Sequence, residues 1–270
     1  MLGKFIKHEL KETAKHLIPL NLILVLFTVV GCILVGTGLF HQESVSVLSA
    51  FYIFIYILSI FALFIITGVY LTIRFWKTMY SNQGYLTHTL PVSTGAILNT
   101  KILVSAFWVC AAFIITVLSI FALVRVSAGD TWHSIDMSTF KYMVTSTFGI
   151  GYGTFWLYII LTLILSSFSV ILMIFASLSI GQLFTQHRIL GSAGAFIVLY
   201  MIQQIAGIIA LCILSIQTAA FDPETQIESA AFLSKLYHGM FASALIELIF
   251  FIVVFYGTCY YLTKKKLNLE

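Results

Sequence analysis

A carboxyl group lies inside a long apolar stretch near the C-terminus. Glu247 is the only acid within the apolar runs of the sequence, and Ser243 precedes it by about one helical turn. Another apolar run contains the adjacent amides Gln203 and Gln204. An ionisable side chain in such a run is costly to bury, which raises the hypothesis of a functional role, either as a substrate contact or as a proton site. The alternative is a carboxyl group hydrogen-bonded between packed helices, and the sequence leaves both interpretations open.

Other chemistry-bearing patterns are weak. No Ser/His/Asp arrangement rises above chance, and no HExxH motif occurs. The four cysteines fall in four different apolar runs and lack metal-ligand spacing, and a metal site at His41, His133 and His238 would require three separate outer loops to converge. We therefore expect no catalytic residues, no metal site and no enzyme activity in this chain. The run Gly149, Gly151 and Gly153 follows no predicted strand, so close helix packing is favoured over nucleotide binding.

The composition identifies the environment of these groups. Hydrophobic residues make up 60% of the chain and charged residues 9%, against about 25% charged residues in a soluble domain. The apolar runs are continuous, and their lengths are sufficient for a spanning helix, which needs about 20 residues. The strands of a membrane barrel would instead alternate between apolar and polar residues. The prediction is an all-α membrane protein with six transmembrane helices, over residues 17–40, 48–73, 102–124, 155–184, 189–216 and 239–262.

The distribution of positive charge predicts the orientation. Cytoplasmic loops carry an excess of lysine and arginine. With the N-terminus inside, eleven of the fourteen such residues lie on the cytoplasmic side: Lys4, Lys7, Lys11, Lys15, Arg74, Lys77, Lys101, Arg188, Lys264, Lys265 and Lys266. We therefore expect a multi-pass protein of the plasma membrane with both termini in the cytoplasm.

Residues 1–16 are predicted to form a separate amphipathic helix in the inner membrane interface. Leu2, Phe5, Ile6 and Leu10 recur at helical spacing, and lysines occupy the other face. A signal peptide is disfavoured because the following apolar run is long and lacks an A-x-A site. Residues 17–270 are predicted to form one six-helix transmembrane domain, in which residues 217–238 form an outer loop with a short amphipathic helix.

The segment 74–101, RFWKTMYSNQGYLTHTLPVSTGAILNTK, is expected on the cytoplasmic side. It is too polar to span a membrane. Gly84 interrupts a short predicted helix, the residue before Pro91 avoids the α conformation, and Ser93 is placed to cap the next spanning helix.

Several large side chains of this segment are expected to be exposed: Tyr80, Tyr85, Leu86 and Leu90. Such an exposed amphipathic surface is suited to docking a cytoplasmic partner. A connector packed against its own helices is the equally weighted alternative.

The run QGYLTHTLPVS, residues 83–93, followed by Lys101, resembles the loop between the second and third helices of type-2 permeases of ATP-binding-cassette (ABC) transporters. The resemblance is strongest to permeases of Gram-positive bacteria. The predicted order of elements is also similar, with an amphipathic N-terminal helix, six spans, both ends inside and a longer outer loop before the last span.

In that family the loop is a coupling helix that seats in a groove of the ATPase subunit. The resemblance implies that the ATPase contact is formed by Tyr80, Gln83, Gly84, Tyr85, Leu86, Thr87, Leu90 and Pro91. It implies an exporter of peptides, drugs or lipids in which two permease subunits, identical or different, pair with two ATPases. Glu247, Gln203, Gln204 and Ser243 would then be candidates for the substrate pathway.

This chain contains no G-x-x-x-x-G-K-[ST] phosphate loop. ATP and Mg²⁺ would therefore be bound by the partner ATPase, and no cofactor is expected here. No dense basic run with interleaved aromatics indicates nucleic-acid binding. The alternatives are an ion-coupled secondary carrier that uses Glu247, and a membrane scaffold or sensor that transports nothing.

Overall fold

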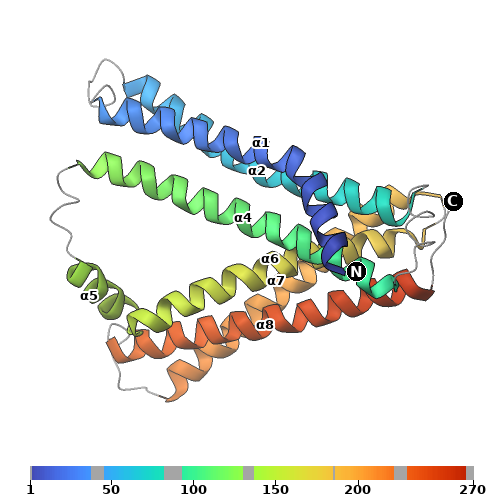
Figure 1. Ribbon diagram of the computed structural model, residues 1–270. Coiled ribbons are helices and arrows are strands. Elements are labelled where there is room, and N and C mark those ends of the chain that lie inside the picture. The colour runs from blue at the N-terminus through green and yellow to red at the C-terminus, as the bar shows by residue number, and fades with distance from the viewer. Residues whose placement is uncertain are drawn as a thin grey trace. The chain divides into compact units, whose positions relative to one another are not determined.

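The structure is a computed structural model that describes residues 2–37, 46–81, 93–129, 137–184, 186–221 and 230–265. Helices account for nearly all of these residues (Figure 1). They are α1 (Leu2–Gly36), α2 (Ser46–Met79), α4 (Thr94–Ala128), α5 (Met137–Phe148), α6 (Tyr152–Gly181), α7 (Arg188–Phe221) and α8 (Ala230–Lys265).

Six helices in the described part of the chain are long and apolar enough to cross a membrane, namely α1, α2, α4, α6, α7 and α8. This confirms the predicted all-α membrane fold. These helices contain 30 to 36 residues, or about 45 to 54 Å at 1.5 Å per residue. The hydrocarbon core is only about 30 Å thick, so each helix must tilt or extend beyond it.

The added length explains the early start of α4. Hydropathy predicts that the third apolar span begins at Ile102, whereas helix α4 begins at Thr94. A helix satisfies its own backbone hydrogen bonds, so it can continue into water after the apolar run ends. Ser93 directly precedes the helix, as predicted for a capping residue.

The N-terminal segment is not separate from the first spanning helix. Residues 2–16 and the following apolar run form the single helix α1, which contains Pro19. A proline removes one backbone hydrogen bond and displaces the carbonyl four residues earlier, which bends a helix. Figure 1 shows α1 bent near its N-terminal end, in the dark blue part of the ribbon.

The predicted outer helix likewise differs from the structure. Residues 230–238 are the first turns of α8, while residues 222–229 lie outside the described part. Gly239 does not interrupt α8. A Cβ atom at Gly239 would lie 3.0 Å from Leu214 Cδ2, so the glycine allows α7 and α8 to approach closely.

The chain divides into two compact units. The first comprises Met1–Phe75 and Ala96–Ile135, and the second comprises Trp76–Gly95 and Asp136–Glu270. The last residues of α2, from Trp76, therefore group with the C-terminal helices. The prediction of one six-helix domain over residues 17–270 stays a prediction.

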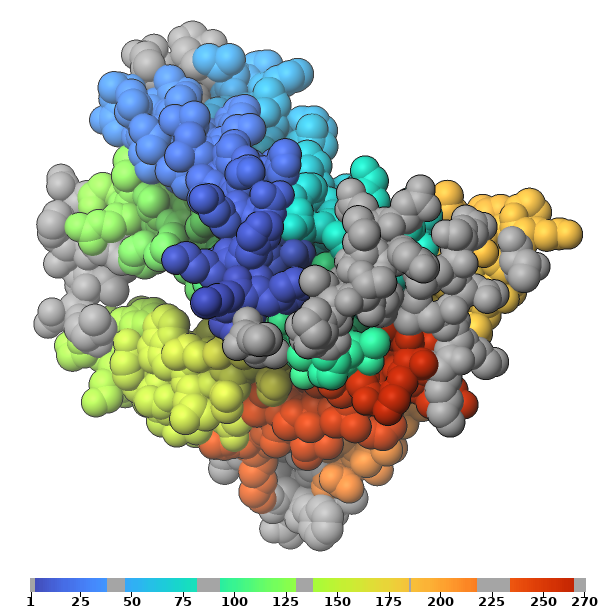
Figure 2. Space-filling model, turned by 45° about the vertical axis from the view of Figure 1, so that its right-hand side comes forward, coloured from blue at the N-terminus to red at the C-terminus, as the bar shows by residue number. Residues whose placement is uncertain are grey.

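The first unit contains α1, most of α2 and most of α4. Figures 1 and 2 both show α1 and α2 lying side by side, in dark to light blue. Its core contains Leu24, Tyr56, Leu63 and Ala112. Tyr56 Oη lies 2.7 Å from Ser119 Oγ, so the α2–α4 contact also contains a hydrogen bond.

The second unit is built on α6, which packs against both α7 and α8. Small residues allow these contacts. A Cβ at Gly181 would collide with Ser192 at the start of α7. At the other end of α6, Gly149 has φ +63°, and Ser234 Oγ donates a hydrogen bond to its carbonyl oxygen at 2.9 Å. The close packing predicted for this glycine run is confirmed at Gly149.

Candidate functional site

The second unit brings four of the predicted site residues together. Gln203 and Gln204 of α7 and Ser243 and Glu247 of α8 line one cavity of about 350 Å³. Their spacing on each helix explains the arrangement. Ser243 and Glu247 are four residues apart and so share a helix face, and Gly207 follows Gln203 by the same interval.

A glycine provides the room for the carboxyl group. A Cβ atom at Gly207 would lie 3.2 Å from Glu247 Oε2 and 3.3 Å from Oε1. Any larger side chain at Gly207 would crowd the carboxylate. The remaining lining is apolar and includes Ile208, Leu211 and Met240.

Two of the polar side chains in this cavity already have protein partners. Gln203 Nε2 lies 3.4 Å from Ser169 Oγ on α6, and Ser243 Oγ donates to the Met240 carbonyl oxygen at 3.0 Å. Within the described residues, Glu247 forms neither a salt bridge nor a hydrogen bond. The alternative interpretation of Glu247, as a carboxyl group hydrogen-bonded between packed helices, therefore finds no hydrogen-bond partner among the described residues.

Most of the predicted ATPase contact lies outside the described residues. This applies to Gln83, Gly84, Tyr85, Leu86, Thr87, Leu90 and Pro91, so their predicted role stays a prediction. Tyr80 is described, and its expected exposure is wrong. Its side chain is buried, with 4% of its surface accessible.

Tyr80 is held by a polar cluster of α6 and α8. Its hydroxyl lies 2.8 Å from Ser179 Oγ and 3.3 Å from Thr263 Oγ1. Ser179 and Thr263 donate their own protons to backbone carbonyls of their helices. The single proton of the Tyr80 hydroxyl is therefore donated toward these two oxygens, of which Ser179 Oγ is the nearer. Burial raises the pKa of Tyr80 to about 12. Tyr80, the first residue of the predicted ATPase contact, is thus tied to the ends of two spanning helices, α6 and α8.

The first unit contains an ion cluster that the sequence reasoning missed. Glu9 Oε1 accepts from Arg74 Nε at 2.8 Å and from Lys101 Nζ at 3.5 Å. The exposed fractions of the Glu9, Arg74 and Lys101 side chains are 12%, 20% and 4%. The available signal was the position of Glu9, which follows Phe5 by four residues and so shares the apolar face of the N-terminal segment.

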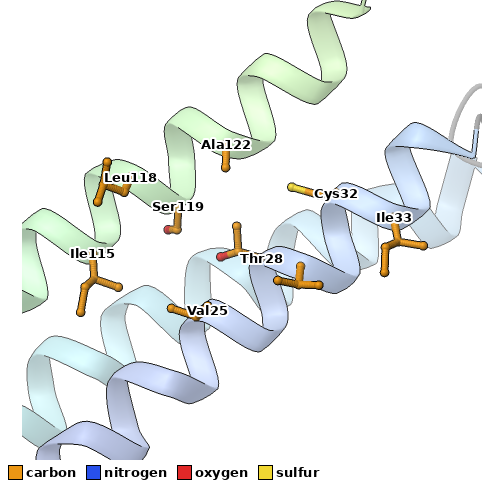
Figure 3. Close-up of a pocket in the computed structure, with 9 residues that line it drawn as sticks. Val25, Thr28, Cys32, Ile33, Ile115, Leu118, Ser119 and Ala122 are labelled. Carbon is orange, nitrogen blue, oxygen red and sulfur yellow. The ribbon is translucent and has the colours of Figure 1, made fainter.

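A second cavity, of about 470 Å³, lies between α1 and α4 in the first unit. Figure 3 shows Thr28 and Cys32 of α1 facing Ser119 and Ala122 of α4 across it. The hydroxyls of Thr28 and Ser119 donate to carbonyl oxygens of their own helices. The rest of the lining is mostly aliphatic, so this cavity offers apolar contact and little polar recognition.

Comparison with known protein families, with curated proteins and with solved structures gave no match.

Proposed function

We propose that this chain is the transmembrane permease subunit of an ATP-driven ABC exporter. A separate ATPase binds ATP and Mg²⁺, and a second permease subunit completes the transporter in the plasma membrane. The six spanning helices and the resemblance of residues 83–93 to the family's coupling loop support this function. The excess of lysine and arginine on one side supports cytoplasmic termini.

The contacts of Tyr80 are the observation that carries this proposal. A docking segment transmits force only if it is attached to the helices that move. Tyr80 precedes residues 83–91 and forms hydrogen bonds with Ser179 of α6 and Thr263 of α8. Displacement of the segment by an ATPase would therefore act directly on both helices.

Helix α8 also provides a route to the polar cavity. Thr263 and Glu247 are sixteen residues apart on α8, or about 24 Å along an unbroken helix. A helix transmits axial and tilting motions over such a distance because its backbone hydrogen bonds are continuous. Closure of the ATPase pair would thus shift Glu247 relative to Gln203 and change access to the cavity.

Charge substitutions in the docking segment test the proposal. Tyr85→Asp or Leu86→Asp should leave the protein folded and the ATPase subunit itself able to hydrolyse ATP, but should reduce substrate export at least tenfold. Asn99→Asp is the matched control, because Asn99 is an exposed position on α4. Unchanged export by both segment variants would refute the proposed coupling.

An ion-coupled secondary carrier is the second candidate, and the cavity at Glu247 favours it specifically. A carrier would move substrate under an imposed proton gradient without any ATPase. Glu247→Gln would then abolish gradient-driven transport, whereas an exporter should show no transport in this assay before or after the substitution.

A further inference from the structure

The cavity between α7 and α8 presents hydrogen-bond acceptors. Ser243 uses its hydroxyl proton on the Met240 carbonyl, so its oxygen can accept from a ligand. Gln203 directs its amide nitrogen to Ser169 at 3.4 Å, which leaves its carbonyl oxygen available. A carboxylate at Glu247 only accepts. The matching ligand is therefore a group with several N–H donors.

The charge of the cavity points to the same chemistry. Among the described residues, its lining combines Glu247 with two neutral amides, one hydroxyl and apolar side chains, and includes no basic residue. A carboxylate in such surroundings is costly unless it is paired. A bound cation would supply the missing positive charge, and Ile208, Leu211 and Met240 would contact an attached apolar chain.

The depth of the cavity favours a molecule that crosses the membrane. Glu247 lies thirteen residues from Ser234 and seventeen from Lys264, the ends of its span, or about 20 and 26 Å. Gln203 lies fifteen residues from Arg188 and fourteen from Gln217, or about 22 and 21 Å. Both groups are near mid-helix, whereas a phospholipid head group in the bilayer stays about 15 Å from the membrane centre.

We propose that this cavity binds the primary ammonium group of a cationic amphiphile. The ammonium lies at the Glu247 carboxylate and donates to the oxygens of Gln203 and Ser243, and the apolar chain lies along the aliphatic wall. This proposal rests on the exporter function and specifies its substrate class.

Binding to the full-length protein tests the proposal without an ATPase. The protein is placed in phosphatidylcholine nanodiscs, and binding of labelled dodecylammonium is compared with binding of dodecanol, which has the same chain and no charge. We expect the ammonium to bind at least tenfold more tightly. Dodecyltrimethylammonium, which is charged but has no N–H donor, should bind more weakly than dodecylammonium.

Three variants separate charge from shape. Glu247→Gln should lower ammonium affinity at least tenfold and leave dodecanol binding unchanged. Gly207→Leu should lower it while retaining the carboxyl group, because the new side chain enters the cavity beside Glu247. Glu12→Gln removes the same charge from a carboxylate paired with Lys15 on α1 and should bind like the wild type.

Equal ammonium affinity in the wild type and Glu247→Gln would overturn the proposal. So would a change in oligomeric state in Glu247→Gln with no change in binding, because the cavity would then be a contact with a second copy. Nanodiscs containing phosphatidylethanolamine identify the source of the ammonium: displacement of the probe indicates a bilayer lipid, and no displacement indicates a free amphiphile. Failure here would leave the exporter proposal standing.

Discussion

Glu9 joins three helices of the first unit through a single carboxylate. It accepts from Arg74 on α2 and from Lys101 on α4 while itself lying on α1. Trp108 Nε1 of α4 also donates to Thr13 Oγ1 of α1 at 2.8 Å. The cluster therefore ties α1, α2 and α4 together within the first unit.

Glu9→Gln should destabilise the protein by about 3 kcal/mol, because the buried ammonium group of Lys101 would lose the negatively charged partner that compensates its burial. Thermal unfolding in detergent, followed by tryptophan fluorescence, measures the loss. Glu12→Gln is the control and should have no measurable effect, since the Glu12–Lys15 pair is exposed. The double variant Glu9→Gln/Lys101→Met should recover part of the stability. A wild-type midpoint for Glu9→Gln would contradict the role of the cluster.

Tyr80→Phe should cost about 1 kcal/mol at neutral pH, the typical loss for one hydrogen bond. The cost should also depend on pH. The pKa of Tyr80 is raised from 10.0 to about 12, so between these values the folded protein retains a proton that the unfolded chain releases. The stabilisation from Tyr80 is complete below pH 10 and is lost as pH rises toward 12.

The measurement is thermal unfolding of the wild type and Tyr80→Phe at about pH 9 and about pH 11, on either side of the tyrosine pKa of the unfolded chain. The stability difference between the two proteins should shrink at the higher pH. A difference that stays constant would show that the Tyr80 hydroxyl is not buried as described.

At the residue level, the sequence draws attention to polar groups where they are rare, and their role in a substrate pathway stays a prediction. Glu247, Gln203 and Gln204 stand out in apolar runs, and the structure places them in one cavity. The Glu9 cluster was missed because its partners lie 65 and 92 residues away. No local pattern indicates which of several lysines and arginines will meet a given acid.

At the scale of elements, hydropathy located the six spanning helices but not their ends. It divided residues 1–16 from the first span and residues 230–238 from the last, whereas α1 and α8 are continuous. A hydropathy change marks where the surroundings of a helix change, and the backbone hydrogen bonds continue across it. Of the glycine run, only Gly149 packs closely among the described residues, against Ser234.

Two glycines of that run make a matched test. Gly149→Ala should destabilise the protein by at least about 2 kcal/mol, because Gly149 has φ +63° and the new Cβ would lie 2.7 Å from Ser234 Cα. Gly153→Ala should stabilise it by about 0.5–1 kcal/mol, because Gly153 lies within α6 and a Cβ atom there would have no described neighbouring atom within 4 Å. Thermal unfolding compares the two, and equal effects would contradict the packing at Gly149.

At the scale of the whole molecule, the structure establishes an all-α membrane protein with spanning helices in both of its compact units. Transport needs these helices to respond to an event outside the membrane. In the proposed exporter, residues 83–91 would receive this signal, and Tyr80 would pass it to α6 and α8, of which α8 lines the polar cavity. The exporter proposal therefore depends on an ATPase that binds this segment.

Purification of the tagged protein in mild detergent, with mass spectrometry of the copurifying proteins and an ATPase assay, tests that dependence most directly. We predict a soluble ATPase in stoichiometric amount, ATP hydrolysis in the eluate, and loss of both from Leu86→Asp but not from Asn99→Asp. A pure preparation without an ATPase or hydrolysis, or an ATPase retained equally by Leu86→Asp, would contradict the proposed coupling.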